Sequence, residues 1–357
     1  MSELVRAAVA AIVEGRSLSQ DEARLAMGAV MDGEATPSQL AALLMGLRMR
    51  GETVDELAGF ASAMRERVTR VEAPPNAVDV VGTGGDGAGT FNISTTAALV
   101  VASLGVPVAK HGNRAFTSKS GAADVLDALG VRIDHDAASA AASLRDHSFA
   151  FLFAQTFHPA MRHAGPTRRE MGVRTAFNLL GPLTNPAGAR RALIGVGVTE
   201  VAPKIAEVAH RLGTDRTFVI HGDGVDELPL DDSGVLYVVD ASGVERHEIK
   251  STKLGFKRTP THKLAGGTAT ENAKMVEDVL RGEMSIRRDV VLLNAAAALL
   301  VAGVVERMEE GLDRAALAID AGMAEELLGN LRADRKAAEA AKAEADAAAA
   351  AEKGTAL

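Results

Sequence analysis

From residue 78 onward, short runs of β-branched and aromatic residues alternate with longer helical stretches, and this alternation limits the possible folds. It predicts strands at 78–81, 106–109, 149–153, 193–198, 218–220 and 235–239, and helices near 94–104, 121–129 and 202–212. Alternation of this kind favours a mainly parallel sheet covered by helices. Ligands of such sheets lie beyond the carboxyl ends of the strands. We therefore predict an α/β fold with its site at that edge.

The first 70 residues instead predict helices alone. Helix-start signals occur at Ser19, Thr36 and Thr53, where a hydroxyl residue is followed three positions later by Glu or Gln. Pro74 and Pro75 then end the helical pattern. We predict a helical domain at 1–72, completed by helices around 158–190, and an α/β domain at 73–335. The Ala-rich end at 336–357 predicts a helical or disordered tail.

Composition excludes several classes of protein. The chain has 357 residues, with 39 Lys and Arg against 47 Asp and Glu, which gives a net charge of −8. This balance argues against non-specific binding to nucleic acid or membranes. The absence of cysteine excludes disulfides, thiolate nucleophiles, iron–sulfur clusters and cysteine-bound zinc. The apolar run at 7–13 is too short for a signal peptide, and no run of about 18 apolar residues occurs, so we expect a cytoplasmic protein.

A glycine-rich loop follows the first predicted strand, where residues 79–96 read DVVGTGGDGAGTFNISTT. Gly82, Gly84 and Gly87 match the dinucleotide pattern G-x-G-x-x-G, which requires an acidic residue about 20 positions later. The next strand leads instead into the basic run KHGNR, and Asp86 inside the loop would repel a pyrophosphate that lacks a metal ion. No Gly-Lys-Ser/Thr closes the loop as in a P-loop. The alternatives are another phosphate cradle at a helix N-terminus or a plain strand–helix turn.

Two further loops favour the phosphate interpretation. After the second strand, Lys110, Arg114 and Lys119 accompany several hydroxyls just before a helix, which suggests a ligand with two separated phosphate groups. After the strand near 218–220, Asp226 and Glu227 are adjacent, and such carboxylates suit Mg²⁺ held together with substrate phosphates. Taken alone, this stretch favours a solvated acidic turn, and only beside the two phosphate loops does it favour a metal site. Elsewhere, the guanidinium of Arg168 can bind a carboxylate of a ligand. A purely structural role for this residue is an equal alternative.

Long motifs occur in a fixed order along the chain: GTGGD, NIST, KHGNR, SGAADVLDALG, HPAMRHAGPTRRE, FNLLGPLTNP, DGVDE, LAGGTATENA and VVLLNAAAALLVAG. In this order they resemble the anthranilate phosphoribosyltransferase family of tryptophan biosynthesis. The resemblance extends from the N-terminal helices to about residue 330 and leaves out the Ala-rich tail. It implies a small helical domain, a larger α/β domain and a homodimer formed through the helical part.

The resemblance also implies a reaction, in which the amine of anthranilate displaces pyrophosphate from 5-phosphoribosyl-1-pyrophosphate. It implies a pair of Mg²⁺ ions per subunit, held by Ser94, Asp226 and Glu227. Anthranilate would contact Gly82, Asn113 and Arg168, and no residue is assigned as a general acid or base. The implied contacts of the phosphoribosyl donor are Gly82, Gly85, Asp86, Thr90, Asn92, Ile93, Ser94, Thr95, Lys110, His111, Gly112, Asn113, Arg114, Ala115, Phe116, Thr117, Ser118 and Ala122.

Two positions depart from the family pattern. Thr117 stands where serine is frequent and keeps the hydroxyl, whereas Ala122 replaces a serine or glycine, which weakens it as a side-chain contact. Two rival interpretations belong to other classes of protein. A pyrimidine nucleoside phosphorylase has a similar architecture but lacks the KHGNR run and needs no pair of acidic metal ligands. A non-catalytic relative that binds single-stranded nucleic acid would show a basic stripe and lose the metal or donor motifs, whereas this acidic chain keeps both.

Overall fold

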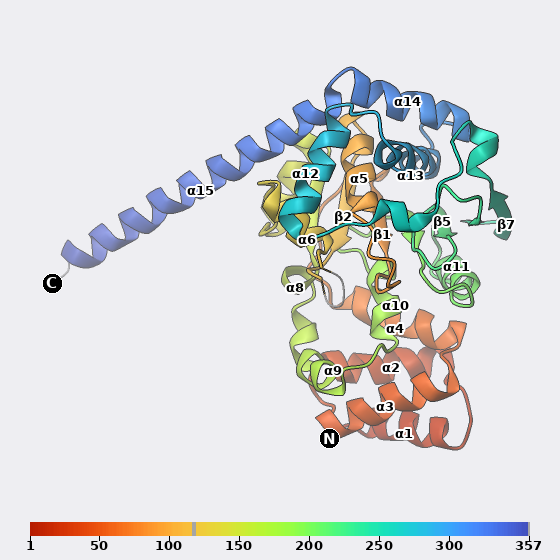
Figure 1. Cartoon of the computed structure of the whole chain (residues 1–357). Helices are drawn as coiled ribbons and strands as arrows, with labels where there is room; N and C mark the ends of the chain where they lie inside the picture. The colour runs from red at the N-terminus through yellow and green to blue at the C-terminus, as the bar shows by residue number, and fades with distance from the viewer. Residues whose placement is uncertain (116–118, 356–357) are drawn as a thin grey trace.

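The computed structural model describes residues 1–115 and 119–355, the side chains of 349–355 excepted. The chain begins with the helices that form the lower part of Figure 1: α1 (Glu3–Val13), α2 (Gln20–Met31), α3 (Pro37–Arg50) and α4 (Val54–Glu66). The last three begin at the predicted signals, because Ser19, Thr36 and Thr53 each accept a hydrogen bond from the third N–H of the helix. Their apolar residues meet in one buried cluster.

A sheet follows, and within the described residues it has seven strands in the order β3-β2-β1-β4-β5-β6-β7. Strands β1 to β5 pair in parallel, and β6 and β7 are antiparallel. The strands are β1 (Val78–Gly82), β2 (Val108–Gly112), β3 (Phe149–Phe153), β4 (Arg191–Gly195), β5 (Arg216–His221), β6 (Gly234–Asp240) and β7 (Gly243–Ile249). The α/β fold with a mainly parallel sheet is therefore confirmed.

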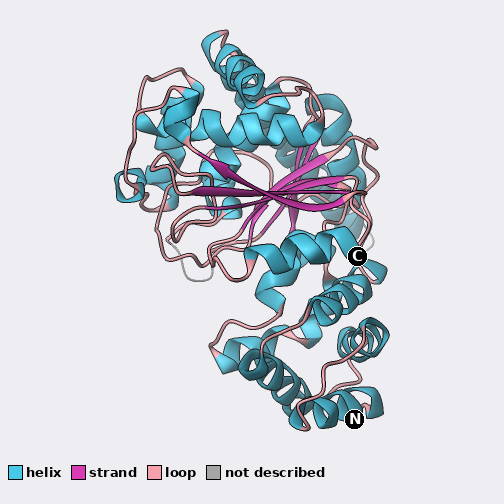
Figure 2. Ribbon diagram, turned by 90° about the vertical axis from the view of Figure 1, so that its right-hand side faces the viewer, coloured by secondary structure: helices cyan, strands magenta, loops and turns pink. Residues whose placement is uncertain are grey.

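Helices cover both faces of the sheet, as the edge-on view in Figure 2 shows. On one face, apolar strand residues such as Val80 and Phe218 share a core with α5 (Ile93–Ser103), α6 (Ala122–Ala128), α12 (Ala269–Leu280), α13 (Ile286–Ala302), α14 (Met308–Asp320) and the start of α15 (Met323–Thr355). On the other face, Val81 and Val219 share a core with α11 (Ala202–Arg211) and with the N-terminal helices. The sheet and the helical part are thus joined by continuous apolar packing. Helix α7 (Ala137–His147) packs on β3.

The segment between β3 and β4 runs to the N-terminal helices and back. It contains α8 (Ala154–Phe157), the 3₁₀ turn η1 (Pro159–His163), α9 (Gly165–Met171), α10 (Phe177–Leu180) and the 3₁₀ turn η2 (Gly181–Leu183). Ala164, Phe177 and Leu180 lie in the same buried cluster as α1 to α4. We call α1 to α4 together with residues 159–180, which contain η1, α9, α10 and the turns between them, the helical lobe. Two further 3₁₀ turns, η3 (Ser251–Leu254) and η4 (Thr261–Leu264), precede α12.

The Ala-rich end belongs to the long helix α15, which projects away from the body of the protein in Figure 1. The boundary predicted at 335/336 therefore falls inside one helix. Leu327, Leu328 and Leu331 are buried in the core, whereas residues 340–348 are exposed. No helix in the part of the chain that the structure describes is both long and apolar enough to cross a membrane.

Candidate active site

The glycine loop (residues 83–92), which follows β1, meets the acidic loop (222–233), which follows β5. The Gly84 N–H donates to Asp226 Oδ2 at 2.9 Å, and the Ser94 N–H donates to Glu227 Oε1 at 3.0 Å. The Asp226 N–H in turn points to Asp86 Oδ2 at 3.4 Å. Both strands are parallel members of one sheet, so their carboxyl ends lie at the same edge. The structure thus brings together Asp86, Ser94, Asp226 and Glu227, which are predicted for donor or metal binding. Gly84 of the glycine pattern lies with them.

Glycine is required where these loops touch. A Cβ atom at Gly82 would overlap the Asp226 carboxylate, and one at Gly195 would overlap the Asp226 backbone. Gly84 and Gly85 have φ angles of +61° and +65°, a conformation that favours glycine. β4 accordingly ends at Gly195, before the predicted limit of residue 198. Gly82 and Gly195 thus let the ends of β1 and β4 pack closely against Asp226, whereas Gly84 and Gly85 give the loop its left-handed turn.

Glu227 is buried and the adjacent Asp226 is partly buried, which is costly for charged groups. Burial, and then the nearby Asp86, raises the pKa of Asp226 to about 7. Burial, and then Asp226, raises the pKa of Glu227 well above its ordinary value. Among the described residues no group of three or more His, Asp or Glu side chains could hold a metal ion alone. The donor set instead fits Mg²⁺, which binds one or two carboxylates and takes its other ligands from water or substrate phosphates.

Asn294 of α13 holds the acidic loop in place. Its side chain accepts from the Leu228 N–H at 2.9 Å and donates to the Leu228 carbonyl at 3.0 Å. The residue is fully buried. Sequence reasoning missed this role, although a single Asn inside the apolar run VVLLNAAAALL is a visible signal of a buried polar contact.

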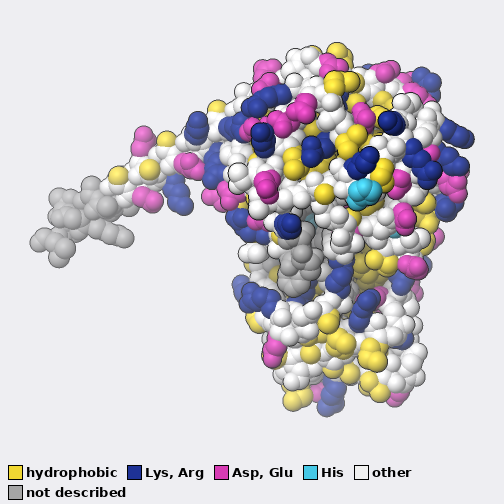
Figure 3. Space-filling view, viewed as in Figure 1, with side chains coloured by type: hydrophobic (Ala, Val, Ile, Leu, Met, Phe, Trp, Pro, Cys, Tyr) yellow, Lys and Arg dark blue, Asp and Glu magenta, His cyan; other side chains and the backbone are white. Residues whose placement is uncertain are grey.

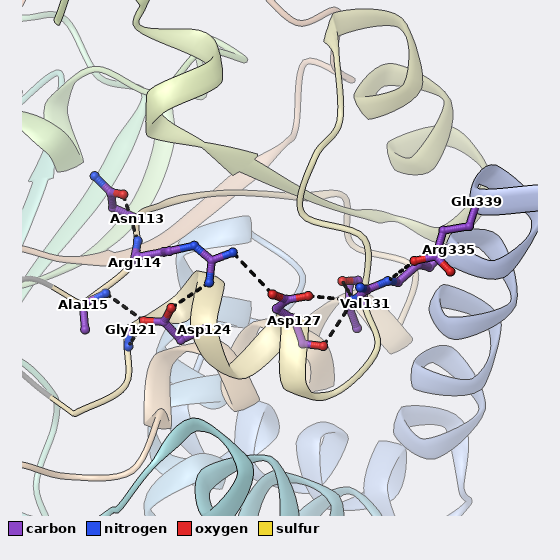
Figure 4. A network of polar contacts seen from close by, with 9 residues as sticks. All are labelled: Asn113, Arg114, Ala115, Gly121, Asp124, Asp127, Val131, Arg335 and Glu339. Atoms are coloured by element: carbon purple, nitrogen blue, oxygen red, sulfur yellow. Dashed lines mark hydrogen bonds and ion pairs between the residues drawn. The ribbon is translucent and has the colours of Figure 1, made fainter. Parts of the chain in front are cut away.

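Asp124, at the start of α6, binds both sides of the second loop (residues 113–121), as Figure 4 shows. Its Oδ2 atom accepts from the N–H groups of Ala115 at 2.8 Å and Gly121 at 2.9 Å. Arg114 donates to Asp124 at 2.9 Å and to Asp127 at 3.3 Å, and Asp127 also pairs with Arg335 of α15. Burial opposes ionisation of Asp124, but these donors hold its pKa below the ordinary value. Arg114 therefore faces carboxylates of α6 in this structure.

The strand β2 differs from its prediction of 106–109, and this changes the place of two site residues. Pro107 has no N–H for the ladder, and β2 begins at Val108 and extends to Gly112. Lys110 and His111 are consequently strand residues, with only 2% and 4% of their surfaces exposed. The Lys110 ammonium donates to the Val80 carbonyl inside the sheet. Lys110 is therefore not a loop cation in this structure, and direct contact with a phosphate would require that bond to break.

His111 pairs with His158, whose place in the site was not predicted. The two rings are 5.1 Å apart between centroids. His111 Nδ1 lies 3.0 Å from the Gly181 carbonyl. Burial lowers the pKa of His111 to about 3 and that of His158 to about 4, so both rings are neutral at pH 7. Within the described residues, neither Nε2 atom has a hydrogen-bond partner.

Asn92 joins the glycine loop to its surroundings. Its side-chain amide donates to the Ser120 carbonyl at 3.3 Å, and its Oδ1 atom accepts from Asn272 of α12 at 2.9 Å. The next residue, Ile93, begins α5, and the side chains of Ile93 and Thr95 are buried. These two can therefore meet a ligand only through the backbone at the helix N-terminus.

Other predicted residues flank this centre. Thr90 forms an isolated bridge with Ala265, the Phe151 ring fills the space beside Gly112, and Ala122 is the first residue of α6. Asn113 is exposed, and its side chain accepts from the Arg114 N–H at 2.8 Å. The predicted contacts Phe116, Thr117 and Ser118 lie outside the described residues.

Arg168 lies on α9 in the helical lobe. Its guanidinium carbon is 4.8 Å from the centre of the Phe177 ring, and burial lowers its pKa. No carboxylate in the part of the chain that the structure describes pairs with it, and no hydrogen bond joins it to Gly82 or Asn113. A partly buried guanidinium without an anionic partner is suited to bind a carboxylate.

Comparison with known proteins agrees with this arrangement. Residues 6–68 match the model of the glycosyl transferase family, helical bundle domain, and residues 74–325 match that of the glycosyl transferase family, a/b domain. The anthranilate phosphoribosyltransferase of Xanthobacter autotrophicus is 51% identical over 334 residues, which cover 93% of this chain and 97% of that protein. The one from Pelotomaculum thermopropionicum is 48% identical over 323 residues, covering 90% and 94%.

Solved structures give the same result. The crystal structure of anthranilate phosphoribosyltransferase from Thermus thermophilus superimposes with a TM-score of 0.86 at 43% identity, covering 92% of this chain and 99% of that one. The Saccharomyces cerevisiae enzyme superimposes with a TM-score of 0.85 at 27% identity, covering 94% and 99%. With a matching α/β domain over most of its length and relatives that are about half identical, this chain belongs to the anthranilate phosphoribosyltransferase family.

Proposed function

We propose that this chain transfers the phosphoribosyl group of 5-phosphoribosyl-1-pyrophosphate to the amine of anthranilate, a step of tryptophan biosynthesis. The observation that carries the proposal is the meeting of the glycine loop, the N-terminus of α5 and the adjacent carboxylates of Asp226 and Glu227 at one edge of the sheet. The yeast relative was solved in complex with PRPP and Mg, and a variant of it at 25% identity in complex with 4-fluoroanthranilate. Both ligands match the proposed substrates.

We assign the metal to Ser94, Asp226 and Glu227, with a pair of Mg²⁺ ions per subunit. Burial raises the pKa of both carboxyl groups, and a bound cation would relieve that cost. When bound, Mg²⁺ supplies positive charge that stabilises the leaving pyrophosphate. The glycine-loop amides and the N–H groups at the start of α5 add donors that are already oriented. The remaining donor contacts are those that the family resemblance implies.

In the proposed reaction, the anthranilate nitrogen forms a bond to the anomeric carbon of the ribose as the C–O bond to pyrophosphate breaks. The amine gives up one proton to water, and pyrophosphate leaves with the electron pair. An aromatic amine is neutral at pH 7, so no residue is assigned as a general acid or base. Arg168 pairs with the anthranilate carboxylate and, with Gly82 and Asn113, orients the amine.

Assembly and location are part of the same proposal. We propose a homodimer formed through the helical lobe, because Leu4, Val13, Leu25, Met45 and Met49 of α1 to α3 are large hydrophobic residues that remain exposed. Figure 3 shows hydrophobic side chains at the lower end of the molecule, over these helices. The domain limits at 72/73 and 335/336 and the cytoplasmic address stay predictions.

A fluorescence assay tests the function. Anthranilate fluorescence should fall when protein, 5-phosphoribosyl-1-pyrophosphate and Mg²⁺ are combined, and it should persist when Mg²⁺ is chelated. Product formation should be confirmed by release of pyrophosphate in equal amount. Unchanged fluorescence together with phosphorolysis of thymidine, or with binding of single-stranded DNA, would overturn the proposal.

A variant then tests the placement of anthranilate. Arg168→Ala removes the proposed partner of the carboxylate and should raise the anthranilate KM about tenfold or more. The donor KM should change far less. Steady-state kinetics in which both KM values rise equally would contradict the assignment of Arg168.

A further inference from the structure

Arg174, which has no role in the site described above, reaches the glycine loop from the helical lobe. It lies in the turn between α9 and α10. Its Nη1 atom donates to the Gly84 carbonyl at 2.7 Å across 90 residues of sequence. The guanidinium also lies so close to Gly85 that a Cβ atom there would overlap it. Gly85 is therefore glycine for a second reason besides its positive φ angle.

The glycine loop needs external contacts to keep one conformation. Gly84, Gly85, Gly87 and Gly89 all have positive φ angles, and glycine loses more backbone entropy on ordering than any other residue. Between residues 83 and 88, the other hydrogen bonds come from the ends of strands, the acidic loop or the glycine loop itself. Among the described residues, Arg174 is the one group of the helical lobe that binds this stretch.

The Gly84 residue is held at both of its backbone polar groups. Its N–H donates to Asp226, and its carbonyl accepts from Arg174. A metal ion bound by Asp226 draws on the same carboxylate that now accepts the Gly84 N–H. The Arg174 bond uses no metal ligand, so metal binding and this bond do not compete.

The type of side chain also fits a specific contact. Arg174 is partly exposed, and within the described residues no carboxylate pairs with it. A guanidinium is planar and keeps further N–H groups after one bond to a carbonyl, which lysine cannot reproduce in the same geometry. A solvated arginine extends into water, whereas the Arg174 guanidinium lies against the backbone of Gly85.

We propose that Arg174 is a positioning residue for the phosphoribosyl donor. It holds the Gly84–Gly85 turn in the conformation that receives the donor and so connects the helical lobe to the donor cradle. The identity of the donor rests on the proposed function, whereas the ordering of the loop by Arg174 does not.

Hydrogen exchange of the substrate-free and metal-free protein tests the ordering directly. Arg174→Ala should speed amide exchange in peptides covering residues 83–89 about tenfold or more, from the loss of a hydrogen bond to a charged donor. Arg169→Ala, an exposed arginine of the same segment, should leave that exchange unchanged. Equal exchange rates in wild type and Arg174→Ala would overturn the proposal.

Kinetics test the consequence for the donor. Arg174→Ala should raise the donor KM about tenfold, with the anthranilate KM within about twofold and the Tm unchanged. Arg174→Gln, a neutral side chain that can still donate to the Gly84 carbonyl, should restore part of the donor KM and is the variant to use if the alanine form does not fold. An unchanged donor KM in an active enzyme would overturn the role of Arg174. A wild type without transferase activity would overturn the proposed function and leave the exchange result to decide on the loop.

Discussion

At Asp226, exchange of one oxygen for an amide nitrogen removes a charge and keeps the shape of the side chain. Asp226→Asn can still accept the Gly84 N–H, but it binds Mg²⁺ poorly. We expect kcat to fall at least about tenfold and the Mg²⁺ concentration for half-maximal rate to rise. Steady-state rates over a Mg²⁺ titration measure both.

The stability of this variant separates metal binding from folding. Burial raises the pKa of Asp226 to about 7, so its ionised form destabilises the metal-free fold. Metal-free Asp226→Asn should therefore unfold at the same temperature as wild type or a higher one. Asp223→Asn, an exposed neighbour on the same loop, is the matched control and should change neither activity nor Tm. A large loss of Tm in Asp226→Asn would mean that the carboxylate is structural.

His158 gives a pH dependence with a defined sign. Its pKa is about 4 in the folded protein and about 6.5 in the unfolded chain, so the unfolded chain binds more protons between these values. The contribution of His158 to the free energy of unfolding is complete above pH 6.5 and is lost as the pH falls toward 4. The loss amounts to at most about 3 kcal/mol. His111 acts in the same direction, whereas Asp79, whose pKa burial raises to about 6, acts in the opposite one.

A variant isolates this contribution. In urea unfolding at several values between pH 7 and 4.5, His158→Gln should lose less stability on acidification than wild type does, because glutamine does not titrate. The difference between the two proteins cancels the effect of Asp79 and reports His158 together with its influence on the neighbouring His111. Parallel curves for the two proteins would show that His158 is protonated in the folded state as easily as in the unfolded one.

At the scale of elements, the second loop depends on the first turn of α6. Asp124→Asn keeps an acceptor but loses the ion pair with Arg114 and weakens the bonds from Ala115 and Gly121. We expect the donor KM to rise several-fold, because the loop and Arg114 lose their fixed positions. Asp146→Asn, an exposed carboxylate on α7, is the control. Steady-state kinetics with equal donor KM values in the two variants would contradict the role of Asp124.

Elements set by local sequence could be predicted, and those set by distant contacts could not. The hydroxyls of Ser19, Thr36 and Thr53 start helices through neighbours three residues away, so the sequence displays the signal. The strand β7 was missed because its middle residues are exposed and polar and gain their ladder only from β6. The start of β2 at Val108 follows from Pro107, which is a local signal, whereas its extension to Gly112 follows from pairing with β3, which no local pattern records.

The candidate site divides in the same way. Asp226 and Glu227 are adjacent in sequence, and the glycine loop is continuous, so both were visible as candidates. Asn294 binds Leu228 across 66 residues, and Arg174 binds Gly84 across 90. Such contacts depend on the order of strands in the sheet and on the path of the segment between β3 and β4. These two contacts are visible only in the structure.

At the scale of the whole molecule, α15 has a packed part and a free part. Removal of residues 340–357 takes away exposed side chains in the described range, so the free energy of unfolding should change by less than about 0.5 kcal/mol and activity should persist. Leu328→Ala, in the packed part of the same helix, should cost about 2–5 kcal/mol. Chemical denaturation of both proteins measures the contrast. A truncated protein as unstable as Leu328→Ala would show that the projecting end has a partner in the fold or the dimer.

The proposed dimer is the last property that belongs to the whole molecule. Met49 is 83% exposed on α3, and burial of a methionine side chain in an interface stabilises the complex. Met49→Lys would place a charge in the proposed interface of the helical lobe, so light scattering after gel filtration should show a shift toward monomer at micromolar concentration. Met284→Lys makes the same change at a residue that is 80% exposed but lies outside the helical lobe, and it should stay as dimeric as wild type. If Met284→Lys dissociates and Met49→Lys does not, the interface lies on the α/β part, and the exposed hydrophobic residues of α1 to α3 serve another contact.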